Sequence, residues 1–271
     1  MFQPNHTTMQ RAKGLGRLAV KLGRGQTRLD RMHESGAAKL RIPKRGDGSF
    51  EAVLINTAGG LTGGDEMSWR FEVAAQCAAT FTTQACEKIY ASSGGTAKVT
   101  THITVGTNAK LAWLPQETIL FDKSQLTRSL TVDLAAGAQV LIVEPVALGR
   151  LAMGESRITG LFQDRWRISQ GGRLIHAEDF KIGPDISNVA DKVSVLGGAG
   201  SFATLLLISP RAESLLEPAR EIIATQGGAS FWNGKLLARL TAKDAYTLRK
   251  RLIPLVSLLN FEAALPQCWT L

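Results

Sequence analysis

Few side chains in this sequence have the types and spacing that metal chemistry requires. His176 and Glu178 would share one face of a strand, because residues two apart point the same way, and Asp179 follows them. No second His or Cys lies near this group, so a closed structural zinc site cannot be completed there. The histidines are scattered and form no HExxH spacing: His6, His33, His102 and His176.

Cysteine chemistry is also weakly indicated. Cys86 could act as a nucleophile, but no His partner is indicated nearby, and a small buried thiol is the commoner case. Cys77, Cys86 and Cys268 form an odd set without a CxxC spacing. Such a set is typical of reduced thiols, so we expect a cytoplasmic protein and not a disulfide framework.

Two glycine patterns imitate a dinucleotide-binding fingerprint. Gly14-x-Gly16-x-x-Ala19 follows a polar stretch and not the strand that the fingerprint requires. Gly198-x-Gly200-x-x-Ala203 follows a strand-like run at 193–196, but an apolar β-like run comes after it in place of a helix. No helix N-terminus would then face a pyrophosphate. Glycine turns between strands are the favoured interpretation of both patterns.

The most unusual segment is 56–65 (NTAGGLTGGD), which has four glycines in six positions after an apolar run. Its backbone can take positive φ angles and approach another surface closely. It is not a phosphate-binding P-loop, because no Lys-Ser/Thr pair follows the last glycine. Two interpretations stay open: a ligand loop, or a tight hairpin or bulge in which Asp65 bonds the turn amides.

The charge is concentrated at one end of the chain. The 271 residues carry a formal net charge of +9 and a pI near 9.7. Residues 1–45 contain eleven basic and two acidic side chains, so the whole excess falls within them. A basic nucleic-acid-binding β protein is the alternative that this charge suggests, but residues 10–45 contain no Phe, Tyr or Trp for base stacking. We interpret the segment as a strand-and-turn edge available to an acidic partner surface.

The elements that would position these residues are mainly strands. Trp69, Phe71 and Val73 alternate with polar residues, and runs at 99–105, 130–134, 140–143 and 165–169 are also strand-like. Turn signals lie between these runs, which favours a many-stranded β stack, either β-helix-like or a sandwich. No repeat of 20–50 residues is visible, so a regular solenoid is not supported. No apolar stretch is long enough to span a bilayer.

The C-terminal quarter has a different pattern. Residues 211–225 and 242–260 are compatible with two helices, and Asn233-Gly234 between apolar runs predicts a hairpin. Pro218 is awkward within the first helix, and Pro254 predicts a kink in the second. We expect a single domain over 1–271, with 211–260 as a helical addition containing the hairpin and with residues 1–10 disordered.

Four segments together resemble a known family. They are 59–65 (GGLTGGD), 82–90 (TTQACEKIY), 113–122 (WLPQETILFD) and 149–155 (GRLAMGE). In this order they are similar to the GG-[LV]-x-GGD, TTQ-x-x-x-K-x-Y, WLPQE-x-I-x-F-x and GR-x-x-x-GE motifs of the urease accessory proteins of the D type, called H in some organisms. Two departures concern loop conformation: Thr57-Ala58 replaces a Pro-bearing approach to the glycines, and Val143-Glu144-Pro145 stands where many members have a Trp-Glu pair.

The resemblance implies a non-enzymatic scaffold with a mostly β fold and two helices. With an F-type and a G-type accessory protein, such members bind apo-urease, and GTP hydrolysis by the G-type partner is coupled to nickel insertion. It implies no catalytic residue, no tightly bound cofactor, and neither nucleic acid nor a membrane as a partner. The residues that carry the family motifs or form a structural loop are Gly59, Gly60, Gly63, Gly64, Asp65, Lys88, Tyr90, Trp113, Pro115, Gln116, Glu117, Gly149 and Arg150.

Two further groups follow from this function as hypotheses. Leu252, Leu255 and Leu258 could face the helical F-type partner from the C-terminal helix. Nickel in transit could meet borderline ligands along an internal polar path, although ordinary salt bridging and turn capping are the favoured explanation of these residues. The candidates for that path are Asp65, Cys86, Glu117, Asp122, Glu144, Glu155 and Glu178.

Overall fold

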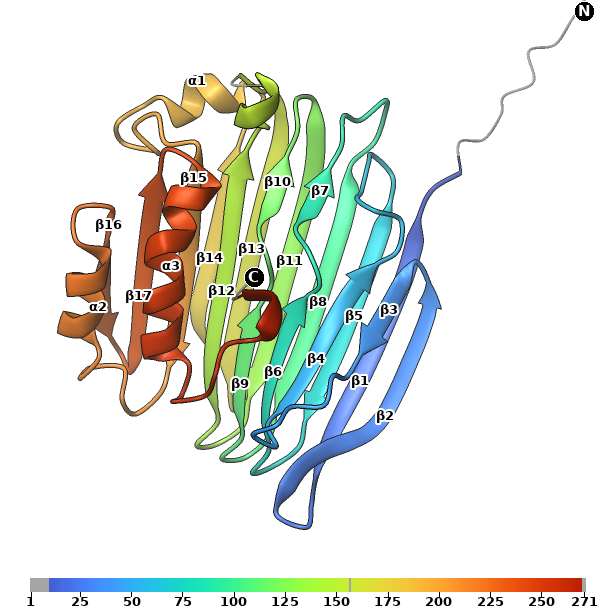
Figure 1. The fold of residues 1–271 in the computed structure, drawn as a ribbon, viewed down its shortest axis with the longest axis vertical. Coiled ribbons are helices and arrows are strands. Elements are labelled where there is room, and N and C mark those ends of the chain that lie inside the picture. Colours follow the sequence, from blue (N-terminus) through green and yellow to red (C-terminus); the bar gives the residue numbers. More distant parts are fainter. Residues whose placement is uncertain (1–9, 156, 270–271) are drawn as a thin grey trace, which may run out of the picture.

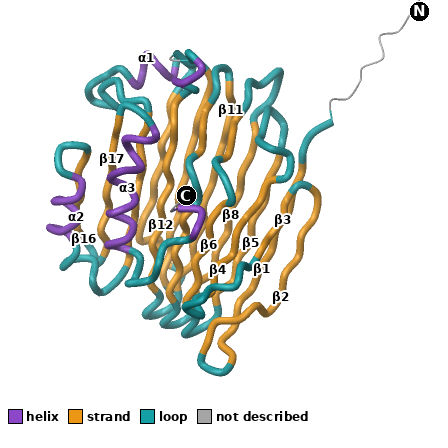
Figure 2. The backbone as a smooth tube through the Cα atoms, in the orientation of Figure 1, coloured by secondary structure: helices purple, strands orange, loops and turns teal. Residues whose placement is uncertain are grey.

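The structure is a computed structural model that describes residues 10–155 and 157–269. Two large β-sheets, called A and B, face each other (Figures 1 and 2). Sheet A has seven strands, in the spatial order β14 (Arg173–Ile182), β13 (Gly160–Gln170), β11 (Ser124–Leu134), β8 (Ala97–Val105), β5 (Glu66–Val73), β1 (Lys13–Gly23) and β2 (Gln26–Gly36). The expected disorder of residues 1–10 falls, apart from Gln10, outside the described residues.

Sheet B has ten strands. Eight of them follow the order β16 (Gly227–Trp232), β17 (Lys235–Ala242), β15 (Ser201–Ile208), β12 (Gln139–Leu148), β9 (Lys110–Leu114), β6 (Ala78–Thr83), β4 (Phe50–Asn56) and β3 (Ala38–Arg41). Two short strands, β7 (Glu87–Ile89) and β10 (Thr118–Leu120), pair with each other, and β10 also pairs with β12.

The chain winds between the two sheets as a solenoid. Strand β4 of sheet B leads into β5 of sheet A, and β6, β9 and β12 lead in the same way toward β8, β11 and β13. Neighbouring strands in this series are parallel within each sheet. The arrangement is a β-solenoid of about four turns. The β-helix-like form of the predicted β stack is therefore confirmed.

The chain does wind as a solenoid, although the sequence shows no repeat. The missing repeat has a physical cause, because the coils differ in length. Phe50 pairs with Ala79, Ala78 with Lys110, and Ser124 with Gly160, so the offset between partners changes from one coil to the next. Insertions in the connections absorb these differences without disturbing the parallel strands. A solenoid with unequal coils leaves no fixed period in its sequence.

Antiparallel strands close both ends of the parallel series. Strand β2 pairs antiparallel with β1, and β14 with β13, in sheet A. In sheet B, β3 pairs antiparallel with β4, and β15 pairs antiparallel with β12. The strand β17 continues sheet B from β15 and forms a hairpin with β16 through Asn233 and Gly234, which both have positive φ. The predicted Asn-Gly hairpin is confirmed.

Two apolar layers hold the fold together. The first lies between the sheets and includes Phe71, Phe81, Ile103 and Phe162. The second lies between the outer face of sheet B and the helices α2 (Leu216–Ile223) and α3 (Ala245–Leu259), which cover it in Figure 1. Because it buries a second set of leucines, sheet B is covered on both faces, as expected for its continuously apolar strand β12.

The two predicted C-terminal helices are confirmed, with shorter bounds. Pro218 lies in the first turn of α2, where a missing N–H costs no intrahelical bond, and Pro254 lies inside α3. The side chain of Asp244 caps α3 by accepting a hydrogen bond from Thr247 N at 2.6 Å. A short helix, α1 (Ile186–Ala190), and two 3₁₀ turns, Leu151–Met153 and Gln267–Trp269, were not predicted. No helix among the described residues is long and apolar enough to cross a membrane.

The expected glycine turns are wrong for the first pattern and confirmed for the second, whose Gly198 and Gly200 lie in the turn region before β15. Gly14 and Gly16 lie within β1 and not in a turn, and a Cβ on either would lie within 2.8 Å of Met67 or Trp69 side-chain atoms. These glycines therefore allow close packing of β1 on the interior. Residues 193–196 form turns and not a strand, and Ser201–Ile208 is the strand β15 that follows.

Candidate functional site

The four segments that resemble family motifs meet at one end of the solenoid, where successive coils pass from sheet B to sheet A. A short third ladder, which we call the motif ladder, joins them. Leu61 bridges Ile89, Ile89 pairs with Leu120, and Leu120 pairs with Leu148. All four side chains are buried. The ladder aligns residues far apart in the sequence because each coil contributes one short extended segment.

The glycine-rich segment 56–65 starts this ladder. Strands β4 and β5 belong to different sheets, so the hairpin alternative is excluded and the segment is the first crossing between the sheets. The ligand-loop alternative stays a prediction. The expected role of Asp65 is confirmed: its Oδ2 accepts from Thr62 N at 2.7 Å, and its Oδ1 accepts from Ala12 N at 2.8 Å. A Cβ on Gly60 would lie 2.4 Å from the Tyr90 ring, and one on Gly63 2.0 Å from Ser92 Oγ. The glycines thus permit close approach to the next coil.

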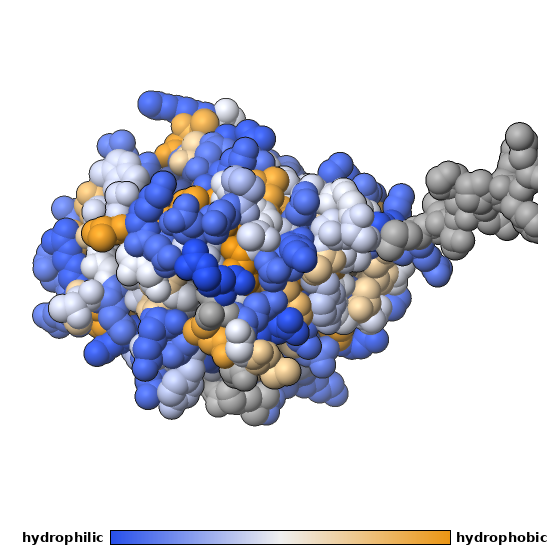
Figure 3. Space-filling model, turned by 90° about the horizontal axis from the view of Figure 1, so that it is seen from above, coloured by the Kyte–Doolittle hydropathy of each residue, from blue (hydrophilic) through white to orange (hydrophobic). Residues whose placement is uncertain are grey.

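An aromatic column, formed by Tyr90, Phe121 and Arg150, runs along the outside of the motif ladder. Tyr90 Oη donates a hydrogen bond to Gly59 O at 3.1 Å, and the Tyr90 and Phe121 rings meet edge to face. The Arg150 guanidinium lies over the Phe121 ring, 4.2 Å from its centroid. Seen from this end, the surface is mostly hydrophilic with separate hydrophobic patches (Figure 3). The column therefore joins four coils and presents the exposed ring of Tyr90, whereas Phe121 is buried.

Arg150 is fixed in turn by Glu155. Its Nε lies 2.9 Å from Glu155 Oε2, and the hydrogen bond from Arg150 holds the pKa of Glu155 below its usual value. Glu155 Oε1 also accepts a hydrogen bond from Asp122 N at 3.0 Å. Gly149, with φ of +74°, continues the ladder by donating from its N to Leu120 O. Segment 149–155 therefore forms a loop that is closed by the Arg150–Glu155 pair and bonded to residues 120–122 of the preceding coil.

The third motif segment anchors the C-terminal region. Arg249 of α3 donates through Nη1 to Gln116 Oε1 and Glu117 Oε1, each at 3.0 Å. Through Nη2 it donates to Trp269 O at 3.0 Å, and its guanidinium lies over the Trp269 ring. Pro115 is buried beside this network. Gln116 and Glu117 thus hold α3 and the last turn against sheet B.

Cys86 lies beside the same carboxylate. Its Sγ donates to Glu117 Oε2 at 3.4 Å. Burial, together with the negative charge of Glu117, raises the pKa of Cys86 to about 11, so the thiol keeps its proton at neutral pH. Cys86 is therefore neither an activated nucleophile nor a preformed thiolate ligand. The other two cysteines, Cys77 and Cys268, are also free thiols.

Glu87 is the least compensated carboxylate near the motif ladder. Asn56 Nδ2 donates to its Oε1 at 3.0 Å, and burial raises the pKa of Glu87 to about 7. A hollow of about 200 Å³ opens beside it, lined by Asn56, Trp69, Cys86 and Lys88 among others. Lys88 itself is exposed. This hollow is the polar recess closest to the glycine-rich segment.

Sequence reasoning missed a charged cluster between the two sheets. Arg128 lies 2.5 Å from Glu144 Oε2 and 2.6 Å from Asp164 Oδ2, and all three side chains are buried. Trp113 Nε1 donates to Glu144 Oε1, and Trp166 Nε1 donates to Asp164 Oδ2. Burial raises the pKa of Glu144 to about 7 despite the positive charge of Arg128. The cluster is a closed internal network joining three strands.

The seven candidates for a nickel path do not gather in one place. Cys86 contacts Glu117, and Asp122 contacts Glu155, whereas Glu144 lies in the interior with Arg128. Asp65 stays in the glycine-rich segment; Glu178, on β14, pairs with Arg239 at 2.5 Å. Within residues 10–155 and 157–269 no group of three His, Cys, Asp or Glu side chains could hold a metal ion together.

The leucines expected to face a partner need correction. Leu252 and Leu255 are fully buried against sheet B, and Leu258 packs at the border of the same apolar layer. The spacing of the leucines in α3 is therefore explained by the packing of this helix on sheet B. An amphipathic sequence cannot by itself distinguish these two uses of an apolar face.

The class of protein that these observations define is a two-sheet parallel β-solenoid whose successive coils are joined at one end by the motif ladder. The model of the family described as UreD urease accessory protein matches residues 12–270. The chain belongs to this family, whose members serve urease maturation as non-enzymatic accessory proteins.

Curated relatives agree along nearly the whole chain. A protein of Mesorhizobium japonicum named urease accessory protein UreD is 54% identical over 266 residues, which cover 97% of this chain and 95% of the relative. One of Rhizobium leguminosarum bv. trifolii is 53% identical, covering 98% and 97%. Urease accessory protein UreD 1 of Brucella abortus biovar 1 is 48% identical, covering 97% and 96%.

Proposed function

We propose that this chain is a cytoplasmic scaffold that, together with F-type and G-type accessory proteins, binds apo-urease. In this complex it supports GTP-dependent insertion of nickel into the urease active site. The observation that carries the proposal is the motif ladder, which gathers all four segments typical of the family on one end of the solenoid. GTP chemistry would belong to the G-type partner.

The motif-bearing end is the surface that we assign to partner contact, in place of the leucines of α3. Tyr90 and Lys88 are exposed there, while the residues beneath them are fixed by the ladder. A preorganised surface loses little conformational freedom on binding, which favours recognition. Lys88 is well suited to a test because it forms no ion pair with another described residue.

The test is co-expression of the chain with urease and its F- and G-type accessory proteins, followed by affinity purification. Lys88→Glu should remove at least one partner from the purified complex and lower urease activation, because it reverses the charge of an exposed side chain on this surface. The matched control is Lys110→Glu at the start of β9, which is also exposed and pairs with Gln139, far along β12 from Leu148 of the motif ladder. Full co-purification with Lys88→Glu would exclude this end as the partner surface.

Nickel is the cargo of this proposed function. Of the candidate ligands, the pairs Cys86–Glu117 and Asp122–Glu155 remain the best placed for transient contacts, because both border the motif-bearing end. Nickel content of purified urease tests them in Glu117→Gln and Glu155→Gln, with Glu221→Gln on α2 as control. Normal nickel loading with both variants would remove these residues from the path. Reduced loading counts only where co-purification of the complex is retained.

A further inference from the structure

The free edge of sheet A has a surface that the motif-bearing end does not explain. Strand β2 is the last strand of the sheet and pairs only with β1 among the described strands. None of its eleven residues is buried. An unpaired edge exposes backbone N–H and C=O groups that can pair with another strand.

One face of this edge is apolar. Leu22, Leu29 and Met32 are 42%, 38% and 45% exposed. The pairing places Leu29 beside Val20 and Met32 beside Leu18, and both of these β1 residues belong to the core between the sheets. The covering strand of sheet B, β3, has only four residues. The apolar residues of β2 are therefore only partly covered, although Leu18 and Val20 beside them are buried.

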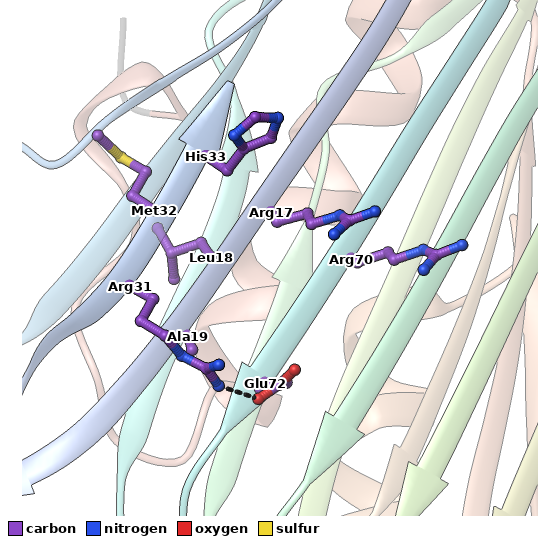
Figure 4. Close-up of a pocket in the computed structure, with 8 residues that line it drawn as sticks. All are labelled: Arg17, Leu18, Ala19, Arg31, Met32, His33, Arg70 and Glu72. Carbon is purple, nitrogen blue, oxygen red and sulfur yellow. Dashed lines mark hydrogen bonds and ion pairs between the residues drawn. The ribbon is translucent and has the colours of Figure 1, made fainter. Parts of the chain in front are cut away.

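The opposite face of the same edge is basic. His33, Arg17 and Arg70 stand side by side on β2, β1 and β5, and Figure 4 shows the two arginines extending in parallel. They border a hollow of about 280 Å³ that also includes Ala19 and Arg31. Arg31 is paired with Glu72 at 2.9 Å, but Arg17 and Arg70 form no ion pair with a described carboxylate. Two neighbouring unpaired arginines repel each other and attract an anion.

We propose that β2 is a docking edge for an extended acidic segment of a partner protein, which adds to sheet A as a further strand. Side chains of a strand alternate between its two faces, so the segment would alternate apolar and acidic residues. The apolar residues would cover Leu29 and Met32, and the acidic ones would face Arg17 and His33. Main-chain pairing would supply affinity, and the two faces would supply selectivity.

Other occupants fit the surface less well. A second copy of β2 would bring no free carboxylate to Arg17 and Arg70, because its acidic residues are already paired, Asp30 with Lys21 and Glu34 with Arg41. Nucleic acid would satisfy the arginines but would leave the apolar face uncovered, and β2 has no Phe, Tyr or Trp on which a base could stack. The charged edge and the bulge between Ala19 and Val20 discourage unselective strand pairing. This inference does not depend on which protein supplies the segment, so it stands apart from the proposed function.

Fluorescence anisotropy with the full-length chain tests the proposal. The probe is a labelled ten-residue peptide of alternating glutamate and valine, titrated at low and moderate salt. Saturable binding that weakens with salt is expected, because the attraction of the arginines is screened. The double variant Arg17→Ser/Arg70→Ser and the single variant Met32→Asp should each weaken binding about tenfold or more.

Matched controls keep the outcome specific. Lys98→Ser/Lys181→Ser removes the same charge from the outer face of sheet A, and Leu174→Asp alters an exposed apolar residue on β14 at its other edge; both should bind the peptide normally. Equal affinity for all variants would overturn the proposal. Equal binding of a lysine–valine peptide would also overturn it. So would a single-stranded oligonucleotide that binds more tightly than the peptide, if that binding requires the two arginines but not Met32.

Discussion

The rings of Tyr90 and Phe121 meet edge to face, with centroids 5.1 Å apart and planes at 87°. The two residues come from consecutive coils and follow Ile89 and Leu120 of the motif ladder. The edge-to-face geometry places the positive edge of one ring against the negative face of the other. Because Arg150 covers Phe121 from the next coil, this contact couples the positions of three separate connections.

Phe121→Ala should therefore lower the free energy of unfolding by about 3 kcal/mol, because it leaves a cavity and removes the contacts of Tyr90 and Arg150. Denaturant unfolding followed by circular dichroism measures the change. Tyr246→Ala, on the exposed face of α3, is the control and should leave stability nearly unchanged. Equal effects of the two changes would mean that the aromatic column does not join the coils.

The glycines of segment 59–65 should differ in their tolerance of a methyl group. Gly60→Ala places a Cβ 2.7 Å from Lys88 O and against the Tyr90 ring, so the ladder must shift, and we expect a loss of about 3 kcal/mol. Gly59→Ala meets no atom within 4 Å and adds only the strain of its φ of +75°, about 1 kcal/mol. Thermal unfolding of the two variants compares them, and a larger loss for Gly59→Ala would contradict this reasoning.

The buried cation Arg128 should be indispensable to the interior network. Arg128→Met leaves Glu144 and Asp164 without a positive partner, which should cost about 3–5 kcal/mol near neutral pH. The loss should shrink in acid, because protonation of the carboxylates removes the uncompensated charge. Unfolding curves at several pH values measure it. Arg165→Met, in an exposed pair with Asp179, should have little effect and a pH-independent one.

This cluster also shows what the sequence pattern contained. Arg128 has the same parity as Leu126 and Leu130, and Asp164 the same parity as Phe162 and Trp166, so both residues fall on the buried face of their strands. Alternation therefore predicts each burial separately. It does not predict that Arg128 and Asp164 meet, because the register between parallel strands depends on the length of the intervening connections.

The same limit explains the other differences. Alternation and turn residues located the strands at 69–73, 99–105 and 130–134, but they could not assign a strand to sheet A or sheet B. The glycine-rich segment could be interpreted from the sequence as a ligand loop or as a hairpin or bulge, whereas in the structure it crosses between the sheets. The motif residues could be predicted as a set from the resemblance. Their alignment on one ladder depends on contacts between residues about thirty positions apart, which local pattern does not encode.

Arg249 should control the docking of the C-terminal turn. Arg249→Met leaves Glu117 without its cation and removes the donor to Trp269 O, so residues 267–269 should lose protection against hydrogen exchange. We expect local opening to become easier by about 2 kcal/mol, or roughly thirtyfold faster exchange. Hydrogen exchange with mass spectrometry measures this change. Arg251→Met, exposed on the same helix, is the control, and matching exchange in both variants would argue against the anchor.

Glu87 should make stability fall as pH rises. Its pKa is raised from 4.5 to about 7, so the folded chain holds a proton that the unfolded chain has lost between these values. Glu87→Gln mimics the protonated form: it should change little at pH 4 and stabilise the chain by about 2 kcal/mol at pH 8. Urea unfolding across this range measures the difference. Glu221→Gln, exposed on α2, should show no such pH dependence; a stabilisation by Glu87→Gln that is equal at both pH values would contradict the assignment.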